Sequence, residues 1–176
     1  MLIEDVRTKA RWLYGDDKLS IFFRAWLSDA TLCMVIYRMM SWCDKSILTK
    51  VIAMILCKTN AILCGAVIGK SAKFGRGFVI LHSVGVVVNT RVRGGDNIYV
   101  ESGVVIGETK RGCPILCSNI FIGSGAKIVG DITIGNNVTI GANAVVNKSF
   151  PDNVVIGGVP ARIIRYKNDT ETFLVG

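Results

Sequence analysis

The sequence contains a single histidine, His82, and its six cysteines never form a C-x-x-C pair. A zinc site needs several such ligands at close spacing, so we expect no bound metal. Only three prolines occur, against 19 glycines. Many glycines without prolines favour repeated tight turns over a flexible linker. These shortages argue against a zinc module and against a chain built around a long linker.

Acidic residues are also scarce, with 13 against 21 lysines and arginines, which gives a formal net charge of +8. A basic surplus suits nucleic acid, a membrane surface or a polyanionic small molecule. The basic residues are scattered and form no nucleic-acid-binding motif, which disfavours nucleic acid. The length of 176 residues suits one domain, or a domain with an appendage. Hydrophobic residues make up 51% of the chain, enough to bury a sizeable core.

No long uninterrupted hydrophobic run is present. Residues 47–69 are strongly apolar, but Lys50 and Lys58 interrupt them, and residues 51–57 are too few to span a bilayer. We expect a buried helix there, with peripheral membrane contact as the alternative. The residues after Met1 are charged and lack the apolar core of a signal peptide, and free thiols suit a reducing compartment. The expected location is the cytoplasm, with peripheral contact at the inner membrane as an option.

Residues 1–62 have helical periodicity. Segments 16–27 and 30–45 carry apolar residues at spacings of three and four, with charges between them. Ser28 or Asp29 could cap the second of these helices, because a short oxygen side chain accepts hydrogen bonds from the free N–H groups of a first helical turn.

The period changes at Ile68, where every sixth residue becomes apolar with one exception, Lys110. Glycine directly follows several of these residues, and small or turn-forming residues often stand three positions later. The series is Ile68, Phe74, Ile80, Val86, Val92, Ile98, Val104, Lys110, Leu116, Ile122, Ile128, Ile134, Ile140 and Val146.

A six-residue repeat predicts a three-sided prism. Each hexapeptide supplies a short strand and a corner, and three complete one turn, so that about four coils fit between residues 66 and 149. The sixfold side chains point inward and stack on their equivalents in the next coil. A second inward row follows four residues later at Ala72, Val84, Ala126, Ile132, Val138 and Ala144.

This pattern resembles the hexapeptide-repeat acyltransferases, which form a left-handed parallel β-helix. Residues 123–146, "GSGAKIVGDITIGNNVTIGANAVV", and residues 154–164, "VVIGGVPARII", resemble the serine acetyltransferase branch. Residues 85–107 and Cys113-Pro114 are most similar to the acetyltransferases of exopolysaccharide clusters, of the colanic acid type. The resemblance implies a mainly β fold with a helical N-terminal region at 1–62, a β-helix acyltransferase domain at 63–165 and a tail at 166–176.

His82 lies two residues after Ile80, outside both inward rows, so we expect it at a strand end or corner with its side chain facing outward. The sequence "ILHSVG" matches the family's "LDHATG", and the resemblance therefore makes His82 the catalytic base. Histidine ordinarily titrates near neutral pH and can take a proton from an alcohol that attacks a thioester. The resemblance also assigns the backbone N–H of Gly107 to the oxyanion.

Three positions depart from the serine acetyltransferase pattern. Leu81 stands where that branch has an aspartate, Val67 aligns with the aspartate that orients the histidine, and residues 112–114 replace its arginine-histidine-proline motif. A zwitterionic amino acid would be poorly paired without these charges. We therefore expect a saccharide hydroxyl as acceptor, in exopolysaccharide, capsule or O-antigen synthesis, with Leu81, Ser102 and Cys113 on the acceptor side.

Glu101 and Ser102 follow His82 by nineteen and twenty residues, close to one coil. Glu101 could accept a hydrogen bond from the imidazole and orient it, or could be a solvated carboxylate at a corner. Both interpretations stay open.

The resemblance implies acetyl-CoA as co-substrate, bound in a groove between subunits of a homotrimer. Small residues at Ala126 and Ala142 would leave room for the pantetheine arm, Pro160 would turn the chain away from the last coil, and basic residues could pair with the phosphates. The predicted cofactor-binding residues are Gly107, Ala126, Lys127, Ala142, Lys148, Pro160, Arg162 and Lys167.

Residues 107–119 interrupt the repeat while keeping its phase, which predicts a corner loop that shapes the acceptor pocket. Two alternatives to a saccharide acetyltransferase stay open: a serine O-acetyltransferase of cysteine biosynthesis, and a non-catalytic trimeric scaffold. The N-terminal helices could mediate trimer contacts, higher assembly or docking to a membrane.

Overall fold

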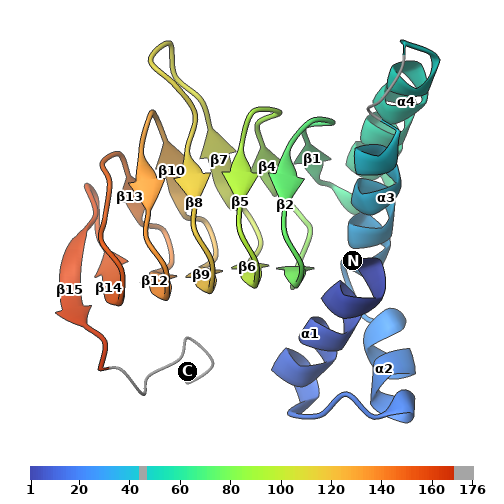
Figure 1. The fold of residues 1–176 in the computed structure, drawn as a ribbon, viewed down its shortest axis with the longest axis horizontal. Coiled ribbons are helices and arrows are strands. Elements are labelled where there is room, and N and C mark those ends of the chain that lie inside the picture. Colours follow the sequence, from blue (N-terminus) through green and yellow to red (C-terminus); the bar gives the residue numbers. More distant parts are fainter. Residues whose placement is uncertain (44–46, 169–176) are drawn as a thin grey trace.

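The computed structural model describes residues 1–43 and 47–168, which form a helical region followed by a parallel β-helix (Figure 1). The four helices are α1 (Leu2–Tyr14), α2 (Leu19–Trp26), α3 (Thr31–Trp42) and α4 (Ile47–Cys64). Strands from successive coils pair in parallel and build three sheets. The predicted parallel β-helix with N-terminal helices is confirmed.

The three sheets are the faces of the prism. Sheet A contains β1 (Val67–Ile68), β4 (Val87–Val88), β7 (Val105–Gly107), β10 (Lys127–Val129) and β13 (Val145–Val146). Sheet B contains β2 (Lys73–Phe74), β5 (Arg93–Gly94), β8 (Ile115–Leu116) and β11 (Thr133–Ile134). Sheet C contains β3 (Phe78–Ile80), β6 (Ile98–Val100), β9 (Ile120–Ile122), β12 (Val138–Ile140), β14 (Val154–Gly157) and the antiparallel β15 (Arg162–Tyr166).

The strand register corrects the sixfold series. Val67 pairs with Val87, twenty residues on, Val87 pairs with Val105 after eighteen, and Val105 pairs with Lys127 after twenty-two. The first coil therefore has two extra residues between Ile80 and Val88, and the third has four extra residues in the loop after β7. Together the two insertions restore the phase, which is why the series looked unbroken in the sequence.

Two inward rows explain why the error left the predicted core almost intact. The strand row continues from Ile80 to Val88, Gly94 and Val100, and the ring of Phe74 fills the space beside Gly94. Val86, Val92, Ile98 and Val104 lie in the second row instead, and all of them are buried. Val84 was wrongly placed in that row, because it follows the insertion and is 70% exposed.

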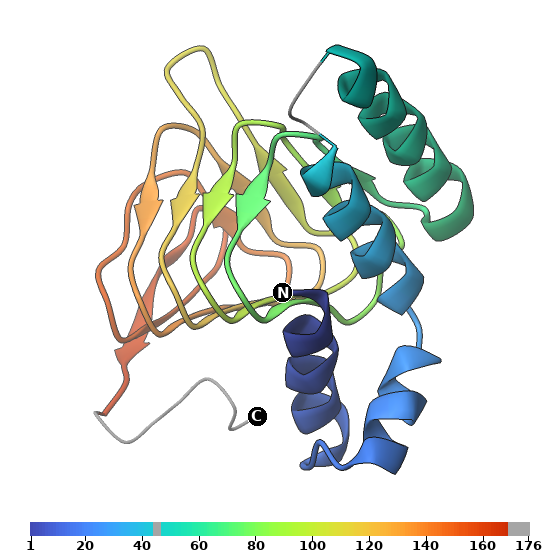
Figure 2. The ribbon, with the colours of Figure 1, turned by 45° about the vertical axis from the view of Figure 1, so that its right-hand side comes forward.

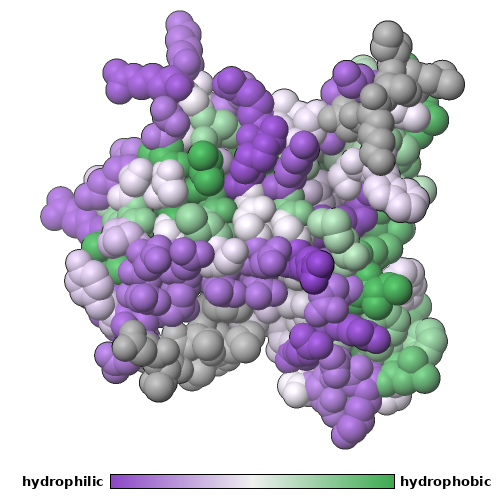
Figure 3. Space-filling model, viewed as in Figure 1, coloured by the Kyte–Doolittle hydropathy of each residue, from purple (hydrophilic) through white to green (hydrophobic). Residues whose placement is uncertain are grey.

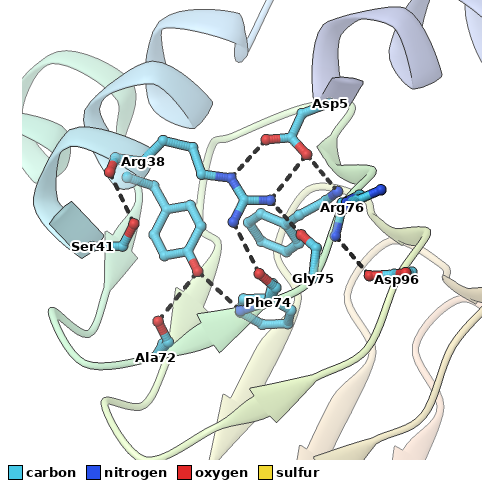
Figure 4. Close-up of polar contacts among 10 residues, drawn as sticks. Asp5, Arg38, Ser41, Ala72, Phe74, Gly75, Arg76 and Asp96 are labelled. Carbon is cyan, nitrogen blue, oxygen red and sulfur yellow. Dashed lines mark hydrogen bonds and ion pairs between the residues drawn. The ribbon is translucent and has the colours of Figure 1, made fainter. Parts of the chain in front are cut away.

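The helices close the first end of the prism through a buried ion pair (Figure 4). Arg38 of α3 donates to both carboxylate oxygens of Asp5 of α1, at 2.6 and 2.9 Å, and to the carbonyls of Phe74 and Gly75. Asp5 also accepts the backbone N–H of Phe78 at 3.1 Å. These contacts join α1 and α3 to the first coil and give hydrogen-bond partners to three of its backbone groups.

Aromatic rings fix α1 against the outer face of sheet C. Trp12 stacks on Phe121 at a centroid distance of 5.2 Å and lies 4.7 Å from the ring of Tyr99. Leu81, the residue before His82, is buried in the same cluster. The helical region thus covers the strands that lead into the histidine.

The far end of the β-helix is closed by its own last strand. Lys167 follows β15, is buried, and donates its Nζ to the side-chain oxygen of Asn137 at 3.2 Å. Asn137 in turn donates to Asn153 in the next coil. Of the tail predicted at 166–176, residues 169–176 lie outside the described residues.

The helix predicted over the apolar segment 47–69 is present as α4, but it is buried on one side only. Ala53 and Asn60 are buried, whereas Ile55 and Ile62 are 60% and 80% exposed. In Figure 3 hydrophobic residues gather along the right-hand edge of the molecule, over the helices. Among the described residues no single helix has the length and apolar character to cross a membrane, although α2 and α3 together, bent by 83°, do by those two criteria.

Candidate active site

His82 is carried on the two-residue insertion of the first coil. At the corner between sheets C and A, Leu81 donates to the carbonyl of Val100, and Gly85 donates to that of Gly65. In the next coil the equivalent donors are Glu101 and Gly103, which are only two residues apart. The extra residues push the corner outward. The His82 side chain is accordingly 61% exposed, as its position outside the inward rows predicted.

The imidazole of His82 is oriented by Asp29, from the segment between α2 and α3. His82 Nδ1 lies 2.9 Å from Asp29 Oδ2, while Asp29 Oδ1 accepts the backbone N–H of Ala30 at 2.7 Å. A carboxylate can only accept, so the proton of a neutral imidazole lies on Nδ1 and the Nε2 lone pair is free. The hydrogen bond from His82 lowers the pKa of the Asp29 carboxyl, assisted by Ala30 N–H and by the charges of His82 and Lys9.

Lys9 of α1 supports the segment that carries Asp29. Its Nζ donates to the Asp29 carbonyl oxygen and, at 3.2 Å, to Thr31 Oγ1. The side chain is wholly buried, and burial lowers the pKa of Lys9 to about 8, opposed by the charge of Asp29. Lys9 therefore fixes the backbone of the segment that places the Asp29 carboxylate beside His82.

The role of Asp29 as the partner of His82 was not predicted from the sequence. Ser28 or Asp29 was expected to cap the helix α3, but its N-cap is Ala30, in the left-handed conformation, with no side-chain cap. The Asp29 side chain turns to His82 instead. Its partner is 53 residues away, so no local pattern could have indicated the contact.

The residues predicted around the acceptor are only partly brought together. Glu101 and Ser102 lie half-buried in the coil next to His82, but the Nδ1 partner of His82 is Asp29 rather than Glu101. Leu81 is 4% exposed and packs under α1, which keeps its side chain from an acceptor. Cys113 and Gly107 lie at the corner between sheets A and B, across sheet A from His82.

Three of the predicted cofactor residues line one cleft at that second corner. Lys148, Pro160 and Arg162 surround a cleft of about 500 Å³ near the end of the β-helix. A neighbouring cleft of about 510 Å³ lies under the loop after β7, between Thr109, Arg111 and Ile132, and Asn147 lines both. The two clefts follow the corner along the prism axis, with basic side chains at each.

The other predicted cofactor residues are placed differently. Ala142 is exposed at the corner that carries His82, three coils further along. Ala126 is wholly buried in the core, so its methyl group lines no groove. Lys127 donates its Nζ to the carbonyls of Gly103 and Gly125, and Lys167 donates to Asn137, so backbone and side-chain acceptors hold both ammonium groups.

Across residues 1–43 and 47–168, no group of three or more His, Cys, Asp or Glu side chains is placed to hold a metal ion. At the described site, the chemically useful groups are the imidazole of His82 and the carboxylate of Asp29.

The comparisons with known proteins decide the family. The bacterial transferase hexapeptide family (six repeats) matches residues 114–148. A crystal structure of serine acetyltransferase from Brucella abortus superposes with a TM-score of 0.83 at 31% identity, over 94% of this chain and 70% of that one. The chain belongs to the bacterial hexapeptide-repeat transferase family.

Two further relatives in this family have the same name. The serine acetyltransferase of Synechococcus elongatus is 35% identical over 135 residues, which are 74% of this chain and 55% of the relative. A Brucella abortus serine acetyltransferase in complex with coenzyme A superposes with a TM-score of 0.83 at 30% identity, over 93% of this chain and 67% of that one. The chain spans about half the length of the curated relatives that it matches.

Proposed function

We propose that this protein transfers the acetyl group of acetyl-CoA to the hydroxyl of serine. The observation that carries the proposal is the exposed imidazole of His82, held by Asp29 at a corner of a β-helix that superposes on serine acetyltransferases. A relative solved with coenzyme A supports acetyl-CoA as the donor.

The predicted saccharide acceptor is contradicted by the relatives, which are named serine acetyltransferases at 35–38% identity. The saccharide was expected because carboxylates are missing at Leu81 and Val67 and residues 112–114 lack the arginine-histidine-proline motif. The helical region nevertheless supplies a carboxylate, Asp29, beside His82. A carboxylate is therefore available near the base to attract the ammonium group of an amino acid.

In the proposed mechanism His82 Nε2 accepts the proton of the serine hydroxyl as its oxygen attacks the thioester carbon. Asp29 stabilises the resulting imidazolium through Nδ1. When the tetrahedral intermediate collapses, the carbon–sulfur bond breaks and His82 returns the proton to the sulfur of coenzyme A. Acetyl-CoA supplies the activated acetyl group, and the basic residues Lys148 and Arg162 would hold its phosphates.

We further propose that the complete site needs two copies of the chain in a homotrimer. His82 lies at one corner of sheet A, whereas the clefts with Lys148 and Arg162 lie at the other. An outward row of side chains runs along the sheet between the two corners, and its members Val67 and Val87 are exposed. Packing such rows against neighbouring copies would bury them and would bring one copy's His82 to the next copy's cleft.

Replacing Asp29 by asparagine should lower kcat roughly 10- to 100-fold with little change in stability. The amide keeps the size of the side chain but removes the charge that stabilises the imidazolium and allows the ring to adopt the other tautomer. The effect is smaller than at a buried triad because the Asp29 side chain is 60% exposed.

The matched control is Asp17→Asn, which removes a half-buried carboxylate of the helical region, ion-paired to Arg11 at 2.6 Å. Steady-state kinetics of both variants, with thermal unfolding in parallel, test the assignment. Equal kcat values for Asp29→Asn and wild type would refute the role of Asp29.

The proposed acceptor is tested by following thiol release from acetyl-CoA with L-serine, and with L-alanine as the matched amino acid without a hydroxyl. We expect serine-dependent release together with a product that is heavier than serine by one acetyl group. Release that is the same with serine and alanine would show only hydrolysis and would contradict the proposal.

A further inference from the structure

The outward side of α4 combines apolar residues with a lysine and has no acidic residue. We define the outer face of α4 by five of its exposed residues, which are Val51, Met54, Ile55, Lys58 and Ile62. Its apolar members are between 52% and 80% exposed. Residues 47–64 contain no aspartate or glutamate, so the lysines are the only charges of the helix.

The arrangement of this face follows from the helical period. At 100° per residue Val51, Ile55, Lys58 and Ile62 fall within one stripe, with Met54 beside it, whereas Lys50 lies outside the stripe. The opposite side of the helix packs inward, with Ala53 and Asn60 buried. In both ribbon views α4 stands at the outer edge of the molecule (Figures 1 and 2).

We propose that the outer face of α4 binds the surface of a membrane that contains anionic lipid. In the interfacial layer the apolar side chains enter the acyl boundary, while the Lys58 stem lies along them and its ammonium group reaches lipid phosphates. Because the other side of α4 is packed against the protein, only this face can enter the lipid. The helix would therefore lie in the plane of the interface.

A second copy of the chain fits this face less well. Lys58 lies between Val51 and Met54 on this face, and a helix pair built from two such faces would bury both Lys58 ammonium groups among apolar side chains. No carboxylate of α4 is available to pair with them, and an unpaired buried charge is strongly unfavourable. Anionic phosphates supply the missing charge without this cost.

Sedimentation of the full chain with lipid vesicles tests the proposal. We expect binding to phosphatidylcholine vesicles that contain about 30% phosphatidylglycerol, weaker binding without the anionic lipid, and release at high salt. Ile55→Glu should abolish binding, and Lys58→Gln should weaken binding to the anionic vesicles by about fivefold. Ile115→Glu, at a 49% exposed position of sheet B, is the matched control and should bind like the wild type.

Three results would overturn the proposal. If the wild-type protein stays in the supernatant with both vesicle types, it has no membrane-binding face. Ile55→Glu that binds like wild type would move the contact elsewhere. If Ile55→Glu instead converts a larger assembly to a smaller one in light scattering without vesicles, the occupant is a second copy. Circular dichroism of each variant verifies that α4 is folded.

Discussion

We expect His82→Ala to lower the kcat of the proposed acetyl transfer to serine by about 10²- to 10⁴-fold, the contribution of a positioned general base. The free Nε2 of His82 is the proton acceptor of the proposed mechanism, and the sequence has no second histidine to replace it. The side chain is 61% exposed, so its removal leaves the fold and the binding of coenzyme A nearly unchanged. Steady-state kinetics and coenzyme A titration of the same preparation measure the two effects separately.

The control for this prediction is His82→Asn, which keeps a polar side chain of similar reach but has no basic nitrogen. Both variants should lose activity to a comparable extent. A kcat within a few-fold of wild type in either variant would remove His82 from the role of base, and the scaffold interpretation would then gain support.

Arg38→Gln lowers the free energy of unfolding by about 3–5 kcal/mol, because it leaves the carboxylate of Asp5 buried without its main partner. Asp5 is wholly buried and Arg38 is 8% exposed. The substitution also removes the guanidinium donors to the carbonyls of Phe74 and Gly75, which would lose their hydrogen bonds at the first coil. Urea unfolding of the two proteins gives the difference.

The double variant Asp5→Leu/Arg38→Met distinguishes an unpaired charge from a general loss of packing. Replacing both partners by apolar residues of similar size should recover much of the lost stability, as apolar replacement of buried ion pairs often does. Equal stability of Arg38→Gln and wild type would mean that this pair does not dock the helices on the β-helix.

The fold was predictable because a short repeat leaves its mark at every coil. Ile68, Ile128 and Ile140 are buried because each lies at the same inward position of its coil. So many apolar residues at one six-residue spacing are not expected by chance. The phase was less predictable. From Val86 on, the two-residue insertion moves the sixfold series from one inward row to the other. Because both rows are buried, the predicted core still contains no polar residue there. Of the apolar residues assigned to the two rows, only Val84, beyond the insertion, was predicted buried and is exposed.

The exposure of His82 was predictable from its register, whereas its partner was not. Asp29 reaches His82 only because α1 and α3 dock on the first coil, and that contact depends on Asp5, Arg38 and Lys9 rather than on the repeat. Lys127 and Lys167 were assigned to phosphates on charge alone. Their hydrogen bonds to Gly103 and Asn137 depend on the coil register and on the position of β15. The charge of a lysine in the sequence does not indicate such acceptors.

The proposed function requires that the imidazole of His82, at the outward corner of the first coil, takes the proton of a serine hydroxyl. A crystal structure of the protein with L-serine and coenzyme A tests it most directly. We predict the serine oxygen within about 3 Å of His82 Nε2, with Nδ1 still bonded to Asp29 and the thiol of coenzyme A beside them. Serine bound away from His82, with the imidazole facing only solvent, would contradict the account.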